Sequence, residues 1–382
     1  MSADRTGFER ALRDARLLIT AGSGGVGKTT TAAAIGLRAA QAGRRVAVLT
    51  IDPARRLADA LGLSELTGEL RQVDPTHFEA AGFACAGEMW AMMLDIKTTG
   101  DQMVRRFAPD AETAARILDN TYYQYFSTSL AGAQEYMAVE QVRTLTADER
   151  FDLVVLDTPP AAHALDFLDA PDRLLAALDS RAMQVLRGGS DADDGLAARL
   201  LGRGKGLVLK SLNKLTGGPF IEELTDFLLL FGSILDALKV SSRSVQALLR
   251  AETTRFFLVS APYRANVDEA VHFKEQLDRR GFPLGGFIIN RVHHPCPWIK
   301  DDVETLAHAL DELADVPLAR REALVTRMLA ALKAHQRMAE RDREAVDRLA
   351  RLNHGPPVLV PLLPQDVRDL RGLDRVARSL TA

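Results

Sequence analysis

Cysteine is nearly absent from this 382-residue sequence. Only Cys85 and Cys296 occur, far apart in the chain. A disulfide framework needs several paired cysteines, so the sequence excludes a small disulfide-stapled scaffold. The scarcity of cysteine fits a reducing compartment, and we expect a cytoplasmic protein.

Long apolar runs and an excess of one charge are lacking too. The most apolar segment, Phe227–Leu235, is shorter than the roughly 20 residues of a membrane-spanning helix, and the first residues lack the apolar core of a secretion signal. Acidic residues number 51 and basic residues 48, which gives no support to a nucleic-acid-binding surface. We expect a soluble protein without a nucleic-acid partner, at most peripheral at a membrane.

Seven short apolar runs, followed by turn residues and helical periodicity, are the main structural signal. Continuous apolar runs suit strands buried on both faces, and their alternation with helices indicates a parallel sheet with right-handed crossovers. The sequence therefore predicts an α/β fold with a doubly wound, mostly parallel sheet flanked by helices. The runs are Arg16–Thr20, Val46–Thr50, Met89–Leu94, Leu153–Leu156, Phe256–Val259, Leu284–Ile289 and Val358–Val360.

Two intervals break this rhythm because they contain helical patterns and no strand pattern. They are residues 97–147 and 171–250. We predict that they form a helical subdomain inserted on one side of the sheet, and that the core comprises residues 1–96, 148–170 and 251–382. Within the core, the charged stretch from Leu318 to about Leu352 is predicted to be a long solvated helix.

The strongest motif is Gly22-Ser23-Gly24-Gly25-Val26-Gly27-Lys28-Thr29, which satisfies G-x-x-x-x-G-K-S/T between a predicted strand and a predicted helix. Such glycines let the backbone curl so that its N–H groups face an anion, and the following helix adds its positive end. Lys28 is then expected to reach the β- and γ-phosphates of ATP, and Thr29 to ligate Mg²⁺. The complete pattern in this context disfavours an incidental Gly-rich turn and predicts a P-loop NTPase.

Two more predicted strands end close to aspartates, Asp52 and Asp157. Ligands of parallel sheets gather at the carboxyl ends of the strands, so both side chains are expected to face the nucleotide. Phosphoryl transfer to water needs one group that orients the water and another that holds the Mg²⁺ shell. We assign Asp52, with Lys28, to catalysis and place Thr29, Asp52 and Asp157 around the metal, partly through water. The alternative is that each aspartate only caps a turn or helix before the prolines that follow.

With these motifs assembled, the sequence resembles the ArsA family of P-loop ATPases, which includes the arsenical-pump ATPase and the factor that targets tail-anchored membrane proteins. The resemblance implies Mg²⁺-dependent hydrolysis of ATP to ADP and phosphate in a dimer, and a role for His163 in coupling nucleotide state to the helical part. It rests on Gly24–Thr30 in the P-loop, Asp52-Pro53-Ala54 in switch I, Gly132-Ala-Gln-Glu135, and Asp157-Thr158-x-Pro160-x-x-His163-x-Leu165, which matches the switch II pattern D-T-x-P-x-x-H-x-L.

The resemblance also implies a site for the adenine base. Ile288-Ile289-Asn290 is similar to the family's strand end, whose asparagine recognises adenine, and Pro361-Leu362 with Asp366–Arg368 is similar to the loop that closes over the base. Asn290, Pro361 and Leu362 thus join Gly22–Thr30 as predicted nucleotide-binding residues. Without the family, Asn290 is an ordinary strand-end turn residue.

Ser23 departs from the family pattern. Dimeric members usually carry a lysine here, which crosses the interface and neutralises charge on the transferring phosphoryl group, whereas serine cannot do so. Three interpretations stay open. A paralogous ATPase supplies the lysine in a heterodimer, which the chemistry favours; a homodimer uses another cation, such as Lys205 or Arg203; or the chain is a weakly active, nucleotide-binding regulatory half.

Further departures concern metals and clients. His293-His294-Pro295-Cys296 stands where the targeting factors carry a zinc-binding C-x-x-C, and its spacing fits a Pro-rich turn better than a tetrahedral site. Two distant cysteines also disfavour an arsenite pump, which needs several thiols. The segment Phe220–Leu238 is apolar nearly all round, so it either packs in the core or presents an apolar face to a protein or membrane-protein client.

Overall fold

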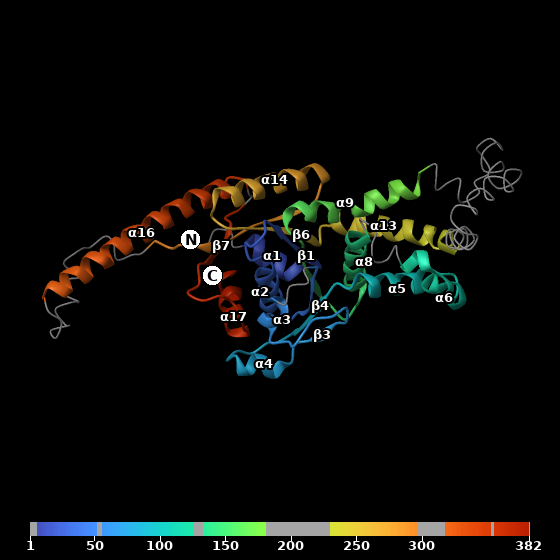
Figure 1. The fold of residues 1–382 in the computed structure, drawn as a ribbon, viewed down its shortest axis with the longest axis horizontal. Helices are drawn as coiled ribbons and strands as arrows, with labels where there is room; N and C mark the ends of the chain where they lie inside the picture. Colours follow the sequence, from blue (N-terminus) through green and yellow to red (C-terminus); the bar gives the residue numbers. More distant parts are fainter. Residues whose placement is uncertain are drawn as a thin grey trace, which may run out of the picture.

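The computed structural model describes residues 6–51, 56–124, 133–180, 230–295, 318–352 and 355–381, which form an elongated molecule around one sheet (Figure 1). Eight strands lie in the order β3-β4-β2-β5-β1-β6-β7-β8, and all neighbours are parallel except β3 and β4. This confirms the predicted doubly wound, mostly parallel sheet. The strands are β1 Leu17–Gly22, β2 Arg45–Thr50, β3 Arg71–Gln72, β4 Glu88–Met93, β5 Leu153–Asp157, β6 Thr254–Ser260, β7 Leu284–Val292 and β8 Val358–Pro361.

Helices cover both faces of the sheet, and a group of them extends beyond one end (Figure 1). The described residues of the interval 97–147 form helices and short connections and include no strand. The extending helices are α5 Ile96–Phe107, α6 Ala111–Asp119, α8 Ala133–Ala147, α9 Ala161–Leu178 and α13 Leu235–Arg250. The others are α1 Thr6–Asp14, α2 Lys28–Gln41, α3 Arg56–Leu61, α4 Pro75–Ala80, α14 Arg264–Arg280, α16 Leu318–Ala350 and α17 Leu370–Ser379.

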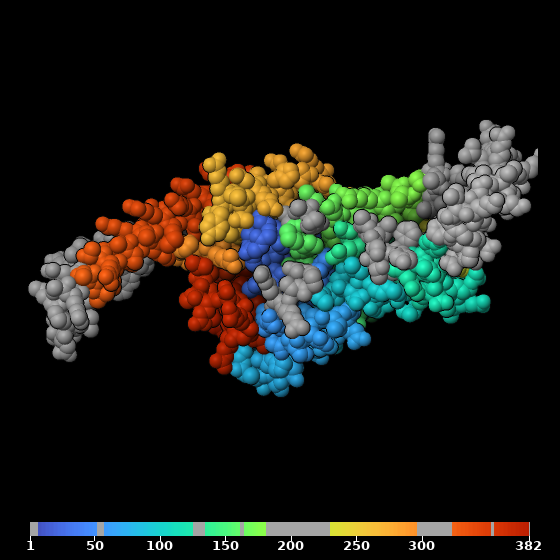
Figure 2. Space-filling model, viewed as in Figure 1, coloured from blue at the N-terminus to red at the C-terminus, as the bar shows by residue number. Residues whose placement is uncertain are grey.

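The core forms because the central strands are apolar on both faces. All six residues of β1 are buried. Leu17 and Ile19 point into a cluster shared with α8, α9, α13 and α14, whereas Leu18 points into the opposite cluster with α2 and α17. In the space-filling view, the C-terminal segment (red) lies against the blue segment that contains α3 and α4, where Arg371 donates to the Ala80 carbonyl (Figure 2).

Three features differ from the sequence-based expectations. Strand β3 was not predicted, because it has only two residues and no apolar run. Helix α9 runs unbroken from Ala161 to Leu178 and so crosses the boundary expected at residue 171, with Pro171 inside it. The predicted helix over Phe220–Leu238 is interrupted by a turn at Ser233–Ile234, and its first ten residues lie outside the described part.

Strand pairing brings the carboxyl ends of β1, β2 and β5, where the predicted nucleotide-binding segments begin, close to one another. Near the amino ends, Arg45 of β2 forms an ion pair of 2.7 Å with Asp152, and this contact lowers the pKa of Asp152 to about 2. The same register, carried along β2 and β5, sets Thr50 opposite Asp157, and β1 sets Thr20 opposite Asp157. The carboxyl ends of β1, β2 and β5 therefore meet at Asp157. Within the described part of the chain, no helix is long and apolar enough to cross a bilayer.

Candidate nucleotide site

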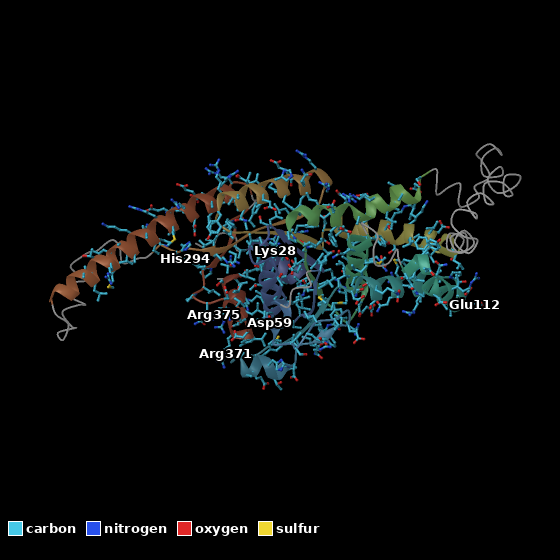
Figure 3. The ribbon with its side chains drawn as sticks, viewed as in Figure 1. Lys28, Asp59, Glu112, His294, Arg371 and Arg375 are labelled. Carbon is cyan, nitrogen blue, oxygen red and sulfur yellow. The ribbon has the colours of Figure 1, made fainter. Side chains whose placement is uncertain are left out.

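The P-loop connects the end of β1 to the start of α2, as predicted. Lys28 is the first residue of α2 and is only 7% exposed, and its Nζ donates to the Ser23 carbonyl oxygen at 2.8 Å. Figure 3 places Lys28 at the centre of the molecule. The loop thus curls around the ammonium group that is expected to meet the phosphates.

The loop has room for an anion. Gly24 and Gly25 are exposed, and a Cβ added to either would meet nothing within 4 Å. The first turn of α2 carries no acidic residue, so the positive end of its dipole is not screened by a carboxylate of its own helix. These residues fit the triphosphate of a nucleotide, and Lys28 supplies the cation.

Gly27 lies against the side chain of Asn290. The same side chain contacts Val26, the residue before Gly27, which is 264 positions away from Asn290 in the sequence. The Asn290 Nδ2 donates to the Val26 carbonyl oxygen at 2.8 Å, and a Cβ on Gly27 would lie 2.3 Å from that nitrogen. Gly27 also has φ 94°, a conformation that side chains disfavour.

We expect Gly27→Ala to lower the free energy of unfolding by about 1–3 kcal/mol, because it combines a steric clash with a left-handed backbone. The matched control is Gly24→Ala, which adds a Cβ in open space without a positive φ and is expected to change stability by less than about 0.5 kcal/mol. Urea denaturation of both variants checks this prediction. Equal stability of the two variants would contradict it.

Asp157 ends β5 in the middle of the site. It is 1% exposed, and its Oδ2 accepts from the Thr50 hydroxyl at 3.0 Å. Its backbone oxygen accepts from the Ile51 N–H at 3.3 Å, which ties it to the residue that precedes Asp52. Thr29 lies in the first turn of α2. The hydroxyl and carboxylate oxygens of Thr29 and Asp157 are the hard donors that Mg²⁺ prefers, so these residues fit the implied metal.

A cavity of about 800 Å³ adjoins the loop. It brings together P-loop residues and all three residues predicted for the adenine base: its walls include Gly25, Gly27, Thr30, Asn290, Pro361 and Leu362. Asp366, Val367 and Arg368 also line it, next to Leu363 and Gln365. Nothing in the sequence singled out Gly62, Leu63, Arg291 or Val376, which line this cavity together with Asp59.

Asn290 is engaged within the protein through both ends of its amide. Nδ2 binds the Val26 carbonyl, and Oδ1 accepts from the Arg291 N–H at 2.9 Å. Arg291 has φ 62°, and the pairing of β7 with β8 shifts register between Ile289 and Val292. This irregular strand end aims Asn290 at the P-loop. A carboxamide has a second N–H and further lone pairs, so capacity for a base remains.

Ser23, the unusual residue of the loop, is 4% exposed and bonded to a distant glutamate. Its hydroxyl donates to Glu269 Oε2 at 2.6 Å. Glu269 lies in the second turn of α14 and is half-buried. No motif marked Glu269 in the sequence, because it is an ordinary polar position of a charged helix.

Several predicted residues lie outside the described part of the chain. They are Asp52 to Ala54, Gly132, Arg203, Lys205, Cys296 and the side chain of His163. His293 is described, and its Nδ1 lies 2.8 Å from Asp342 Oδ2. Among the described residues, no three His, Cys, Asp or Glu side chains are grouped to hold a metal ion.

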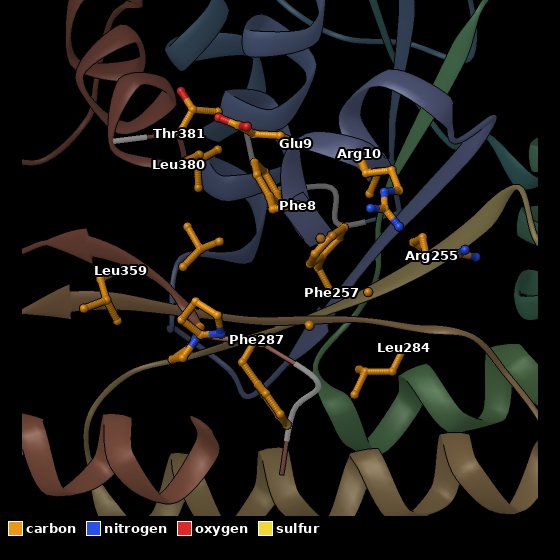
Figure 4. Close-up of a pocket in the computed structure, with 18 of the residues that line it drawn as sticks. Phe8, Glu9, Arg10, Arg255, Phe257, Leu284, Phe287, Leu359, Leu380 and Thr381 are labelled. Atoms are coloured by element: carbon orange, nitrogen blue, oxygen red, sulfur yellow. The ribbon is translucent and has the colours of Figure 1, made fainter. Parts of the chain in front are cut away.

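A second cavity, of about 880 Å³, is lined by α1, by β6, β7 and β8, and by the end of α17 (Figure 4). Phe8 of α1 meets Phe257 of β6 edge-to-face at 5.0 Å between ring centroids, and both line this cavity. Its remaining walls come from the first residues of β7, from β8 and from the end of α17. It shares only Pro361 with the predicted nucleotide-binding residues, so it is separate from the P-loop site.

Comparison with known proteins agrees with this geometry. Residues 15–190 match the family of anion-transporting ATPases, ArsA_ATPase. The chain is 25% identical over 305 residues to the ATPase ASNA1 homolog of Dictyostelium discoideum. The aligned residues cover 78% of this chain and 80% of that protein. It is 30% identical over 164 residues to ATPase get3 of Aspergillus terreus, covering 43% and 45% of the two chains. It is 26% identical over 299 residues to ATPase ARSA1 of Chlamydomonas reinhardtii, covering 73% of this chain and 35% of that protein.

Proposed function

The chain belongs to the ArsA family of P-loop ATPases, and on that premise we propose that it is a Mg²⁺-dependent dimeric switch that hydrolyses ATP. The proposal rests mainly on the cavity of about 800 Å³, which is lined both by P-loop residues and by Asn290, Pro361 and Leu362. A nucleotide whose phosphates lie in the loop can extend its base into this cavity.

In the proposed reaction, the backbone N–H groups of the loop and the ammonium of Lys28 hold the phosphates. Thr29 and Asp157 would hold Mg²⁺, which would neutralise charge on the phosphates. Asp52 orients the attacking water, and Asn290 contacts the adenine edge. Each protein group is supported by the fold: Lys28 by the Ser23 carbonyl, Asp157 by Thr50 and Asn290 by the P-loop backbone.

Nucleotide state is proposed to reach the helical part through α9. This helix begins four residues after Asp157, and its buried residues Phe167 and Leu168 belong to the cluster that contains α8 and α13. A movement of the loop after Asp157 therefore displaces α9, which is packed against α8 and α13. We propose that residues 97–147 and 171–250 form the helical subdomain and that it binds a partner or client.

Five apolar residues of the helical part are packed in the core and are therefore not available to a client. Ile234, Leu235 and Leu238 are buried in the core, as are Met103 and Met137. These residues stabilise the packing of α5, α8 and α13, which is the ordinary role of an apolar helix face.

The second subunit is proposed to be a paralogous ATPase that carries lysine at the position of Ser23. Ser23 itself supports this, because its hydroxyl faces Glu269 and carries no positive charge. The same observation supports a second candidate function, in which the chain is the less active regulatory half of such a pair. An arsenite pump is disfavoured, because Cys85 and Cys296 are the only thiols.

Native mass measurement with ATP, combined with a phosphate-release assay, tests the proposal. We expect the chain alone to hydrolyse ATP slowly, and the mixture with the lysine-bearing paralogue to form a 1:1 complex with faster turnover. Arsenite should stimulate neither sample. Turnover of zero in every mixture, with ATP still bound, would reject the ATPase and favour the regulatory role. Arsenite stimulation would restore the pump.

A further inference from the structure

Ser23 connects two groups of opposite charge across the phosphate-binding loop. Its carbonyl oxygen accepts from Lys28 Nζ at 2.8 Å, and its hydroxyl donates to Glu269 Oε2 at 2.6 Å. Because Ser23 is buried, this arrangement holds the Glu269 carboxylate directly against the loop. A negative charge is therefore built into the immediate surroundings of a site that must accept a triphosphate.

The charge of Glu269 is not neutralised by its own helix. The two nearby arginines, Arg264 of α14 and Arg348 of α16, pair with Asp268. Within the described residues, no lysine or arginine forms an ion pair with Glu269. The hydroxyl of Ser23 donates one hydrogen bond to the carboxylate but carries no charge. Glu269 thus remains an acceptor with capacity for a cation, beside a loop that lacks the cation its family usually carries.

We propose that Ser23 and Glu269 form a receptor for a basic side chain, lysine or arginine, of the second subunit. This inference rests on the dimer of the proposed function and assigns the position at which the partner's cation is held. A cation on Glu269 cancels the repulsion between this carboxylate and the phosphates. Subunit association and ATP binding then favour each other to the same extent, as linkage requires.

Glu269→Gln is expected to change ATP binding by the isolated chain and association with the second subunit in opposite directions. Glu269→Gln keeps the shape of the side chain and an oxygen that accepts from Ser23, but removes the charge. We expect it to tighten ATP binding by the isolated chain about 3- to 10-fold, since one like charge near the phosphates is removed. We expect the same variant to weaken ATP-dependent association with the lysine-bearing paralogue. A purely structural role of Glu269 would weaken both.

The matched control is Glu275→Gln, an exposed glutamate of the same helix. ATP binding is measured by titration calorimetry for wild type and both variants, with methylammonium chloride as the probe cation and with potassium chloride of equal ionic strength as reference. Methylammonium should tighten ATP binding by wild type and by Glu275→Gln. It should leave Glu269→Gln unchanged, because the receptor for the cation is absent.

The outcomes separate this inference from the proposed function. If wild type forms no complex with the paralogue or with itself, the dimer is rejected, and with it the partner's delivery of the cation. If wild type does form the complex, equal association of Glu269→Gln overturns the receptor while the dimer stands. Equal or weaker ATP binding by Glu269→Gln, or an equal effect of methylammonium on it, also overturns the receptor.

Discussion

Replacing Lys28 by methionine is expected to abolish most ATP hydrolysis, with turnover reduced by at least about 100-fold and ATP binding weakened. Lys28 is buried at the start of α2, and the loop curls around its ammonium group. Methionine is close to lysine in length and is also unbranched, so its side chain can occupy the same buried position. It cannot balance the charge on the phosphates, and the loop has no second lysine within Gly22–Thr30.

Phosphate release and equilibrium ATP binding check this prediction, and thermal unfolding confirms that the variant is folded. Lys333→Met is the matched control, because Lys333 is an exposed residue of α16. It is expected to leave both activities unchanged. Hydrolysis by Lys28→Met within a few-fold of wild type would show that the P-loop lysine is not the cation that the reaction uses.

The second large effect is expected for Asp52→Asn, which should retain ATP binding and lose turnover by about 100- to 1,000-fold. Asparagine preserves the size of the side chain but cannot orient and accept a proton from water as a carboxylate does. Asp52 lies outside the described residues. The preceding residue, Ile51, donates its N–H to the Asp157 backbone oxygen at 3.3 Å.

Asp59→Asn provides the comparison for this variant. Asp59 lies on α3, soon after Asp52 in the chain, and lines the nucleotide cavity. The same chemical change at this wall is expected to alter ATP affinity at most a few-fold and to leave turnover close to that of wild type. Single-turnover measurements on both variants separate binding from chemistry. Unchanged turnover of Asp52→Asn would mean that another group orients the water.

The positions of the major strands along the chain could be predicted because their signal is local. Each central strand is a continuous apolar run, such as Leu153–Leu156, and a strand buried on both faces needs no other information. The runs from Arg16, Val46 and Phe256 reappear as β1, β2 and β6 with ends shifted by one or two residues. The two-residue β3 could not be found, since its pairing with β4 depends on the position of the neighbouring strand.

The breaks in helical segments were harder to predict for the same reason. Phe220–Leu238 reads as one apolar-rich helix, so the turn at Ser233–Ile234 was not expected, although Gly232 and Ser233 are residues that favour turns. Conversely, the boundary expected at residue 171 falls inside α9, which continues through Pro171. Packing of Phe167 and Leu168 against the core keeps the helix together where its intrinsic preference is weak.

The sequence by itself determined the phosphate loop, because eight consecutive residues carry all the groups that an anion-binding turn requires. It also determined the strand ends that hold Asp157 and Asn290. Only the tertiary structure decided that Asn290 holds the P-loop, across 264 residues, and that Ser23 faces Glu269, across 246 residues. Such contacts arise because α14 packs against β1 and because β7 lies one strand further along the sheet, with β6 between them. No local pattern encodes a neighbour that is brought in by the rest of the fold.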